Sequence, residues 1–237
     1  MGNFIRKDEM DMNRIKSGTR LYINITNGCN VNCPFCCMYS GTNKCNMMSF
    51  KTFKKIIDKT NGSFELQLEG GEPLINKNIF LFIEYAISTD RCTKVIVLTN
   101  GILLNDYVDR FISIAQWNKI PFEIKISVNY YLLRNDENHL KYLSNLYFAI
   151  KYIPYFNMIL NVRKRRDIDE WIDEEIKNMG LSRISHSFYL QSYGKMSDTK
   201  YDKPTISQNI ESWFIYASDG KCFNQDLIAR SEHEKDL

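Results

Sequence analysis

The sequence predicts an α/β fold in which helices cover a parallel sheet. Six segments are rich in the apolar, β-branched and aromatic residues that form strands, and five segments with helical spacing lie between them. Regular alternation of strands and helices indicates repeated βαβ units, and therefore a parallel sheet. A doubly wound sheet and an open, partial (β/α) barrel both fit this pattern. In either architecture the chemistry belongs at the carboxyl ends of the strands.

The six predicted strands differ in how they are buried. Residues 21–26 alternate apolar and polar side chains, which is typical of a strand with one buried face. Residues 94–98 form a continuous apolar run, which indicates burial on both faces. The predicted strands cover residues 21–26, 64–68, 94–98, 122–128, 156–162 and 184–190.

The five predicted helices follow from apolar spacing and from residues that start or stop a helix. Ser49 is an N-cap for the first helix, and Asn105 or Asp106 caps the third. Gly180 stops the last one. The predicted helices cover roughly residues 50–60, 78–88, 106–115, 135–152 and 169–179.

Composition narrows the class of protein. The chain has 237 residues, a formal charge of +3, 44% hydrophobic and 25% charged residues, as expected for a globular protein that orders most of its length. Its seven cysteines are an odd number, and charged residues recur throughout the first twenty positions, so we expect neither a secreted disulfide scaffold nor a signal or membrane segment. We therefore expect a reduced, cytoplasmic protein. The short basic run at 163–166 precedes an acidic stretch, so nucleic acid is not an expected partner.

Three cysteines lie within eight residues, directly after the first predicted strand. Cys29, Cys33 and Cys36 occupy a loop that also contains Asn and Pro, where buried core cysteines have no reason to gather. Structural zinc takes four ligands, and the sequence has no second Cys-x-x-Cys pair to supply them. A cubane iron–sulfur cluster also takes four cysteines, so three would leave one iron free to bind another molecule.

This Cys-x3-Cys-x2-Cys spacing, with Phe35 before the last cysteine, resembles the cluster motif of the radical S-adenosylmethionine (radical SAM) enzymes. The resemblance implies that Cys29, Cys33 and Cys36 hold one [4Fe–4S] cluster. The amino and carboxylate groups of SAM would chelate the fourth iron, and Phe35 would pack near the adenine.

A second motif strengthens the resemblance. Glu69-Gly-Gly-Glu-Pro73 follows the second predicted strand and is similar to the family's Gly-Gly-Glu-Pro motif, which binds the SAM amino group. Gly70 and Gly71 would let an ammonium approach backbone carbonyls closely, and the Glu72 carboxylate would support its charge. Without the cysteines the same four residues would indicate only a turn.

Polar residues end the later predicted strands at the same edge of the sheet. The resemblance implies that they contact SAM, and an arginine among them would pair with its carboxylate. These candidate residues are Asn100, Ser127, Asn129, Arg163 and Gln191.

The resemblance spans about residues 20–193 and selects the open, partial (β/α)6 barrel with parallel strands. It implies an enzyme in which an external reductant, such as flavodoxin or ferredoxin, supplies an electron that cleaves SAM. The products would be methionine and a 5′-deoxyadenosyl radical, and the radical would take a hydrogen atom from a substrate. Residues 1–19 would form an N-terminal segment and residues 194–237 a C-terminal extension. The aromatic residues Trp213, Phe214 and Tyr216 in that extension would cover the barrel or the substrate site.

Four cysteines remain outside the motif. Cys37, Cys45, Cys92 and Cys222 are too few and too scattered for a second cluster, so we expect one cluster only. Cys222 is a candidate catalytic residue, as a hydrogen-atom donor or a substrate contact, and the alternative is a free thiol.

The substrate is predicted less sharply than the chemistry. Residues 24–30 and the Asp219-Gly220 pair resemble short sequence motifs of peptide-modifying members of the family. They favour a peptide or protein side chain as the substrate. A small-molecule enzyme acting on a nucleoside, a sugar or a deazapurine precursor is a second hypothesis, and a glycyl-radical activase is a third. A non-catalytic metal-binding module is a remote fourth, because a structural metal needs no ammonium site.

Overall fold

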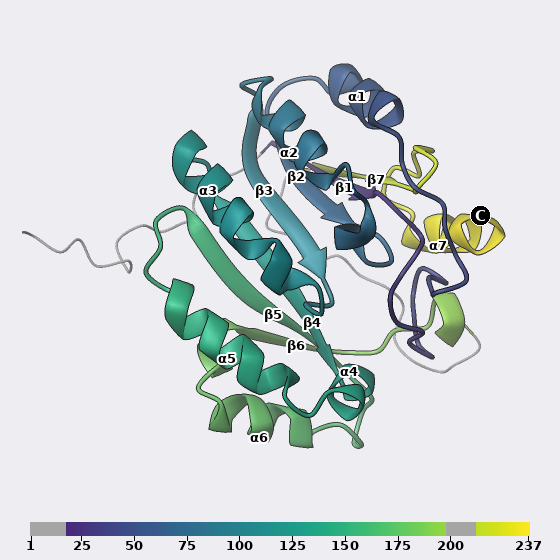
Figure 1. The fold of residues 1–237 in the computed structure, drawn as a ribbon. Coiled ribbons are helices and arrows are strands. Elements are labelled where there is room, and N and C mark those ends of the chain that lie inside the picture. The colour runs from purple at the N-terminus through teal and green to yellow at the C-terminus, as the bar shows by residue number, and fades with distance from the viewer. Residues whose placement is uncertain (1–17, 198–211) are drawn as a thin grey trace, which may run out of the picture.

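The computed structural model describes residues 18–197 and 212–237, which form a seven-stranded sheet with all strands parallel. The order across the sheet is β6-β5-β4-β3-β2-β1-β7, and the sheet curls into a half-barrel with helices along its outer face (Figure 1). The strands are β1 (Thr19–Asn24), β2 (Phe64–Glu69), β3 (Cys92–Thr99), β4 (Phe122–Asn129), β5 (Phe156–Lys164), β6 (Ser185–Tyr189) and β7 (Ser212–Tyr216). The helices are α1 (Phe50–Lys59), α2 (Ile79–Ile87), α3 (Val108–Asn118), α4 (Tyr130–Asn135), α5 (His139–Ile150), α6 (Trp171–Asn178) and α7 (Leu227–Asp236).

The strand order decides between the two predicted architectures. From β1 to β6 each strand lies beside the one before it in the sequence, as in a barrel. A doubly wound sheet would reverse its order at a switch point within the sheet. The open, partial barrel with parallel strands is therefore confirmed.

Two parts of the fold were not predicted. A seventh strand, β7, pairs in parallel with the free edge of β1, from Thr19 beside Ser212 to Ile23 beside Tyr216. The predicted helix over 135–152 corresponds to α5, and a short helix that was not predicted, α4, precedes it, capped by Asn129 at the end of β4.

The outer face of the sheet packs against the helices and forms the hydrophobic core. Along β4 every second side chain, Phe122, Ile124 and Ile126, is fully or almost fully buried there. The Phe122 ring packs against Phe111 of α3, with ring centres 5.2 Å apart, and against Phe156 of β5. Burial of this face supplies the main driving force for folding.

The inner face of the same strands is polar and charged. Lys94 of β3 pairs with Glu123 of β4 at 2.9 Å, and Lys125 lies 3.6 Å from the same carboxylate. Glu65 of β2 pairs with Arg20 of β1. Apolar and charged residues therefore alternate along single strands.

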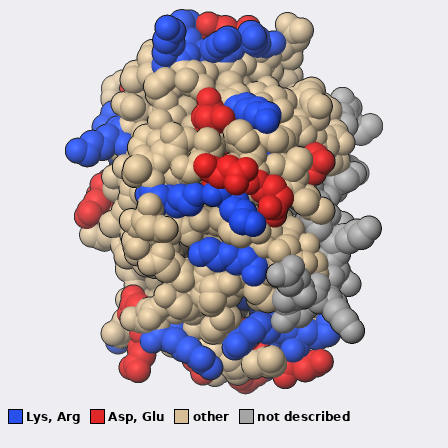
Figure 2. Space-filling model, turned by 90° about the vertical axis from the view of Figure 1, so that its right-hand side faces the viewer, with Lys and Arg blue, Asp and Glu red and all other residues tan. Residues whose placement is uncertain are grey.

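The exposed surface carries both signs of charge. Figure 2 shows acidic residues beside basic ones at the centre of the face that it views, in agreement with a formal charge of only +3. No helix within 18–197 or 212–237 combines the length and the apolar character that crossing a membrane requires.

Candidate active site

The cysteine loop and the glycine turn are interlocked at the carboxyl ends of β1 and β2. The Gly71 amide donates to the Thr26 carbonyl and the Glu72 amide to the Gly28 carbonyl, each at 2.9 Å. A Cβ on Gly71 would lie 2.0 Å from the Gly28 carbonyl oxygen, so only glycine fits. Gly70 has a φ of 145°, which also favours glycine. The cysteine motif and the Gly-Gly-Glu-Pro motif therefore form one structure.

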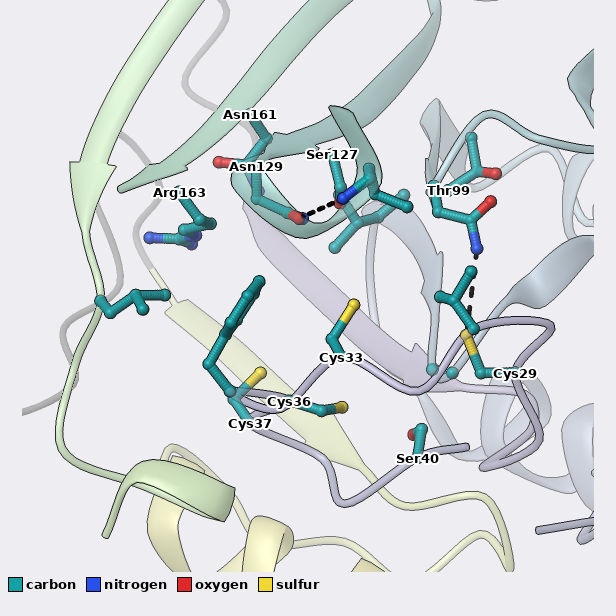
Figure 3. Close-up of a pocket in the computed structure, with 18 of the residues that line it drawn as sticks. Cys29, Cys33, Cys36, Cys37, Ser40, Thr99, Ser127, Asn129, Asn161 and Arg163 are labelled. Atoms are coloured by element: carbon teal, nitrogen blue, oxygen red, sulfur yellow. Dashed lines mark hydrogen bonds between the residues drawn. The ribbon is translucent and has the colours of Figure 1, made fainter. Parts of the chain in front are cut away.

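Most of the predicted site residues line one cavity of about 190 Å³ (Figure 3). In the figure the labelled cysteines lie on one side of this cavity, and the polar ends of β4 and β5 lie on the other. The predicted residues that line it are Cys29, Cys33, Phe35, Cys36, Gly70, Gly71, Asn100, Ser127, Asn129, Arg163 and Gln191.

The three cysteines fit an iron–sulfur cluster by their chemistry and by their spacing. All three are free thiols that line the cavity, and burial raises the pKa of Cys29 and Cys33 to about 12. Iron binds thiolates, so cluster assembly releases these protons. No three Cys, His, Asp or Glu side chains within the described ranges surround a single metal ion. A cubane would be compatible with that finding, because it would take one cysteine at each of three irons and would not require the three thiols to meet at one ion.

Glu72 lies behind the cavity wall and is fully buried. Its carboxylate accepts hydrogen bonds from the Asn100 amide at 2.7 Å, the Thr99 hydroxyl at 2.7 Å and the Leu74 amide at 3.1 Å. Burial raises its pKa to about 7, although these three donors act in the opposite direction. In this arrangement Glu72 joins the glycine turn to the end of β3.

The two predicted asparagines hold backbone and side-chain groups at the rim. The Asn100 side-chain amide donates to Asn30 at 2.6 Å and lies 3.9 Å from the Cys29 sulfur. The Asn129 side-chain oxygen accepts from the amides of Tyr131 and Leu132 and so caps α4.

Arg163 and Phe35 occupy aromatic surroundings. The Arg163 guanidinium lies 4.8 Å from the centre of the Phe188 ring, and in the part of the chain that the structure describes it has no carboxylate partner. Phe35 packs on Tyr130 with ring centres 5.2 Å apart, and the Arg165 guanidinium lies 3.6 Å from the centre of that tyrosine ring. This stack fixes the wall of the cavity beside the cysteines.

The cavity also contains residues that sequence reasoning did not assign. Cys37 and Tyr193 both line it, and the spacing of the cysteine motif predicted no role for either. Tyr193 lies four residues after the end of β6 and two residues after Gln191. This closeness to a predicted site residue was the sequence signal that could have identified it. Cys222 is exposed and does not line the cavity.

Comparison with known proteins identifies the family. The model of the radical SAM superfamily matches residues 23–173, so the chain belongs to that superfamily. It is therefore an enzyme, and its cofactors are those of the family, a [4Fe–4S] cluster and SAM.

Individual relatives are more distant. An uncharacterized protein of Methanocaldococcus jannaschii is 26% identical over 76% of this chain and 77% of its own length. The GTP 3′,8-cyclase of Alkaliphilus oremlandii is 32% identical, over 37% of this chain and 29% of the cyclase.

Solved structures share the fold. Native anSMEcpe with bound AdoMet has a TM-score of 0.56 and 15% identity, over 82% of this chain and 56% of that one. The same enzyme with AdoMet and a peptide named Kp18Cys has a TM-score of 0.55 and 13% identity, over 78% and 55% of the two chains. This chain thus spans little more than half of these enzymes and less than a third of the cyclase.

Proposed function

We propose that this protein cleaves SAM reductively in the cavity described above and takes a hydrogen atom from a peptide or protein side chain. One observation carries the chemistry: three thiols, a glycine turn and the polar ends of β3, β4 and β5 converge on a single cavity. These are the groups that a SAM-binding cluster requires.

In this proposal Cys29, Cys33 and Cys36 hold the [4Fe–4S] cluster, which when bound supplies one electron to the S–C5′ bond of SAM. Cys37 is left outside the ligand set because it falls outside the Cys-x3-Cys-x2-Cys spacing. The protein's own contribution is to orient SAM and to exclude water around it.

The glycine turn and the rim orient SAM. Gly70 and Gly71 present backbone next to the cysteines without side chains, so an ammonium can approach their carbonyls. Glu72 acts through the turn, since its carboxylate is already bonded to backbone and Thr99. Arg163 has no carboxylate partner within the described residues, so the SAM carboxylate is a fitting one.

The remaining predicted contacts line the same cavity as that arginine. Phe35, supported by Tyr130, offers an aromatic face to the adenine. Ser127, Asn129 and Gln191 offer hydrogen-bonding groups to the ribose and the adenine. Because Cys222 lies outside the cavity lining, the proposal gives it no part in hydrogen transfer.

A peptide substrate is supported by two likenesses. Residues 24–30 and Asp219-Gly220 resemble short sequence motifs of peptide-modifying members of the family. The structure of anSMEcpe, which shares the fold, has been solved with a peptide bound. A small-molecule substrate is the second candidate, and the 32% identity to a GTP 3′,8-cyclase favours it. We further propose a cytoplasmic location and flavodoxin or ferredoxin as the reductant.

Anaerobic reconstitution tests the chemistry. The wild type should bind about four irons per chain and release 5′-deoxyadenosine from SAM on reduction. Cys33→Ala should abolish SAM cleavage, whereas Cys45→Ala, an exposed cysteine near the same loop, should leave it unchanged. Zinc in place of iron, or an active Cys33→Ala protein, would contradict the proposal.

The substrate is tested separately. Any short peptide encoded beside this gene should be added, and GTP in a separate reaction, with 5′-deoxyadenosine formation and the mass of the added compound measured. A peptide that stimulates the reaction and loses hydrogen supports the first candidate. Stimulation by GTP alone would replace it with the second.

A further inference from the structure

The C-terminal part of the chain packs directly against the loop that carries the cysteines. The short turn at Gly194–Met196 and helix α7 both lie beyond residues 23–173, the range that the superfamily model matches. In Figure 1, α7 lies beside the purple loop that follows β1. The turn and α7 contact mainly backbone carbonyls of the cysteine loop.

The first contact is made by the turn. The Lys195 amide donates to the Cys36 carbonyl at 3.0 Å, and the Lys195 ammonium lies 3.4 Å from the Cys33 carbonyl. Gly194 is buried with a φ of 63°, and a Cβ there would lie 2.4 Å from the Cys37 Cα and 2.6 Å from the Cys36 carbonyl oxygen. The turn can approach the loop this closely only because residue 194 is glycine.

The second contact is made by α7. The hydroxyl of Ser231, which is fully buried, donates to the Cys37 carbonyl. Beside it the Tyr39 hydroxyl bonds to Glu232 at 3.1 Å, and the Lys44 ammonium bonds to the Lys235 carbonyl at 2.8 Å.

Helix α7 is itself fixed to the barrel by buried charges. Arg230 pairs with Glu69 at 2.7 Å, at the end of the strand that leads into the glycine turn. The Glu234 carboxylate accepts from the side-chain amide of Asn24 at 2.9 Å and from the Ser218 amide at 2.7 Å. The helix therefore connects the ends of β1 and β2 to the cysteine loop.

We propose that Gly194, Lys195 and Ser231 form a carbonyl clamp that positions the cysteine loop and determines how firmly it retains the cluster. The inference rests on the proposed function, which assigns Cys29, Cys33 and Cys36 as ligands. Residues that orient metal ligands typically change metal retention about 10- to 100-fold when they are replaced. The clamp acts on the backbone carbonyls of Cys33 and Cys36, which are proposed ligands, and of their neighbour Cys37. None of the three clamp residues lines the cavity.

Two variants with matched controls test the clamp. Gly194→Ala adds a Cβ against the loop, whereas Gly62→Ala adds one at a similar φ of 70° with nothing within 4 Å. Ser231→Ala removes the donor to Cys37, whereas Ser113→Ala removes an exposed hydroxyl bonded within its own helix.

Each reconstituted protein is measured for iron per chain, for the rate of iron loss to a chelator and for the electron paramagnetic resonance spectrum of the reduced cluster. Thermal unfolding of the iron-free proteins reports general destabilisation. Gly194→Ala and Ser231→Ala should lose iron about tenfold faster and show an altered spectrum, with both controls close to wild type.

The outcomes separate the two proposals. A wild type that binds no cluster overturns the proposed function. A wild type that binds it, with Gly194→Ala and Ser231→Ala losing iron at the wild-type rate, overturns only the clamp. Faster loss that also occurs in the controls, in step with lower unfolding temperatures, overturns the clamp as well.

Discussion

The two faces of the half-barrel are built from the same strands but have opposite chemistry. On β4, Phe122, Ile124 and Ile126 face the helices, whereas Glu123, Lys125 and Ser127 face the interior. The outer face stabilises the fold, and the inner face leads to the cavity. Replacing a residue on the outer face should therefore change mainly the stability of the fold. Replacing a residue on the inner face should change mainly the electrostatics of the interior and the binding of ligands.

The largest effect should come from the outer face. Phe122→Ala removes a fully buried ring that packs on Phe111 and Phe156, so the free energy of unfolding should fall by about 3–5 kcal/mol. Chemical denaturation measures this loss. Phe148→Ala, at a ring that is 49% exposed, is the control and should cost clearly less. Equal losses at both positions would contradict the assignment of the core.

A smaller effect should come from Glu72, where the glycine turn meets the end of β3. Burial raises the pKa of Glu72 to about 7, from an ordinary value near 4.5. Between these two pH values the folded protein keeps the Glu72 proton, whereas the unfolded chain has released it. Stability should therefore fall by about 3 kcal/mol as the pH rises from about 4.5 to 7.

Urea unfolding of the iron-free protein across this pH range tests the Glu72 prediction. Glu72→Gln should remove this part of the pH dependence, because the amide does not titrate. A wild-type and a variant curve with the same slope would show that another group is responsible.

The smallest of the three effects should come from the inner face. Glu123→Gln leaves Lys94 and Lys125 without their shared carboxylate and should cost about 1–3 kcal/mol. The Lys94→Met and Glu123→Gln double variant should lose less than the sum of the single losses. Strict additivity in that cycle would mean that the pair does not interact.

The strands and the rim of the site could be predicted because their signals are local. Alternation within residues 21–26 or 122–128 identifies a strand, and two short motifs identify the cysteine loop and the glycine turn. Parallel strands bring their carboxyl ends together, so residues as far apart as Cys29 and Gln191 could be assigned to one cavity.

The rest depends on contacts between distant residues. Strand β7 is five residues long, and its Ser212 bonds to Thr19, 193 positions earlier. Nothing in its short aromatic sequence indicates that partner. The motif at 69–73 likewise does not show that the Glu72 carboxylate turns toward Thr99, because that direction depends on the end of another strand.

The hydrogen bond from Ser231 to the Cys37 carbonyl has a consequence for when the cysteine loop becomes ordered during protein synthesis. The two residues are 194 positions apart, so a ribosome making 5–20 residues per second completes the loop roughly 10 to 40 s before the residue that supports it. During that interval the cysteine thiols are already made but the loop lacks its C-terminal support. Iron insertion after the chain is complete would therefore meet an ordered loop, whereas earlier insertion would meet a loose one.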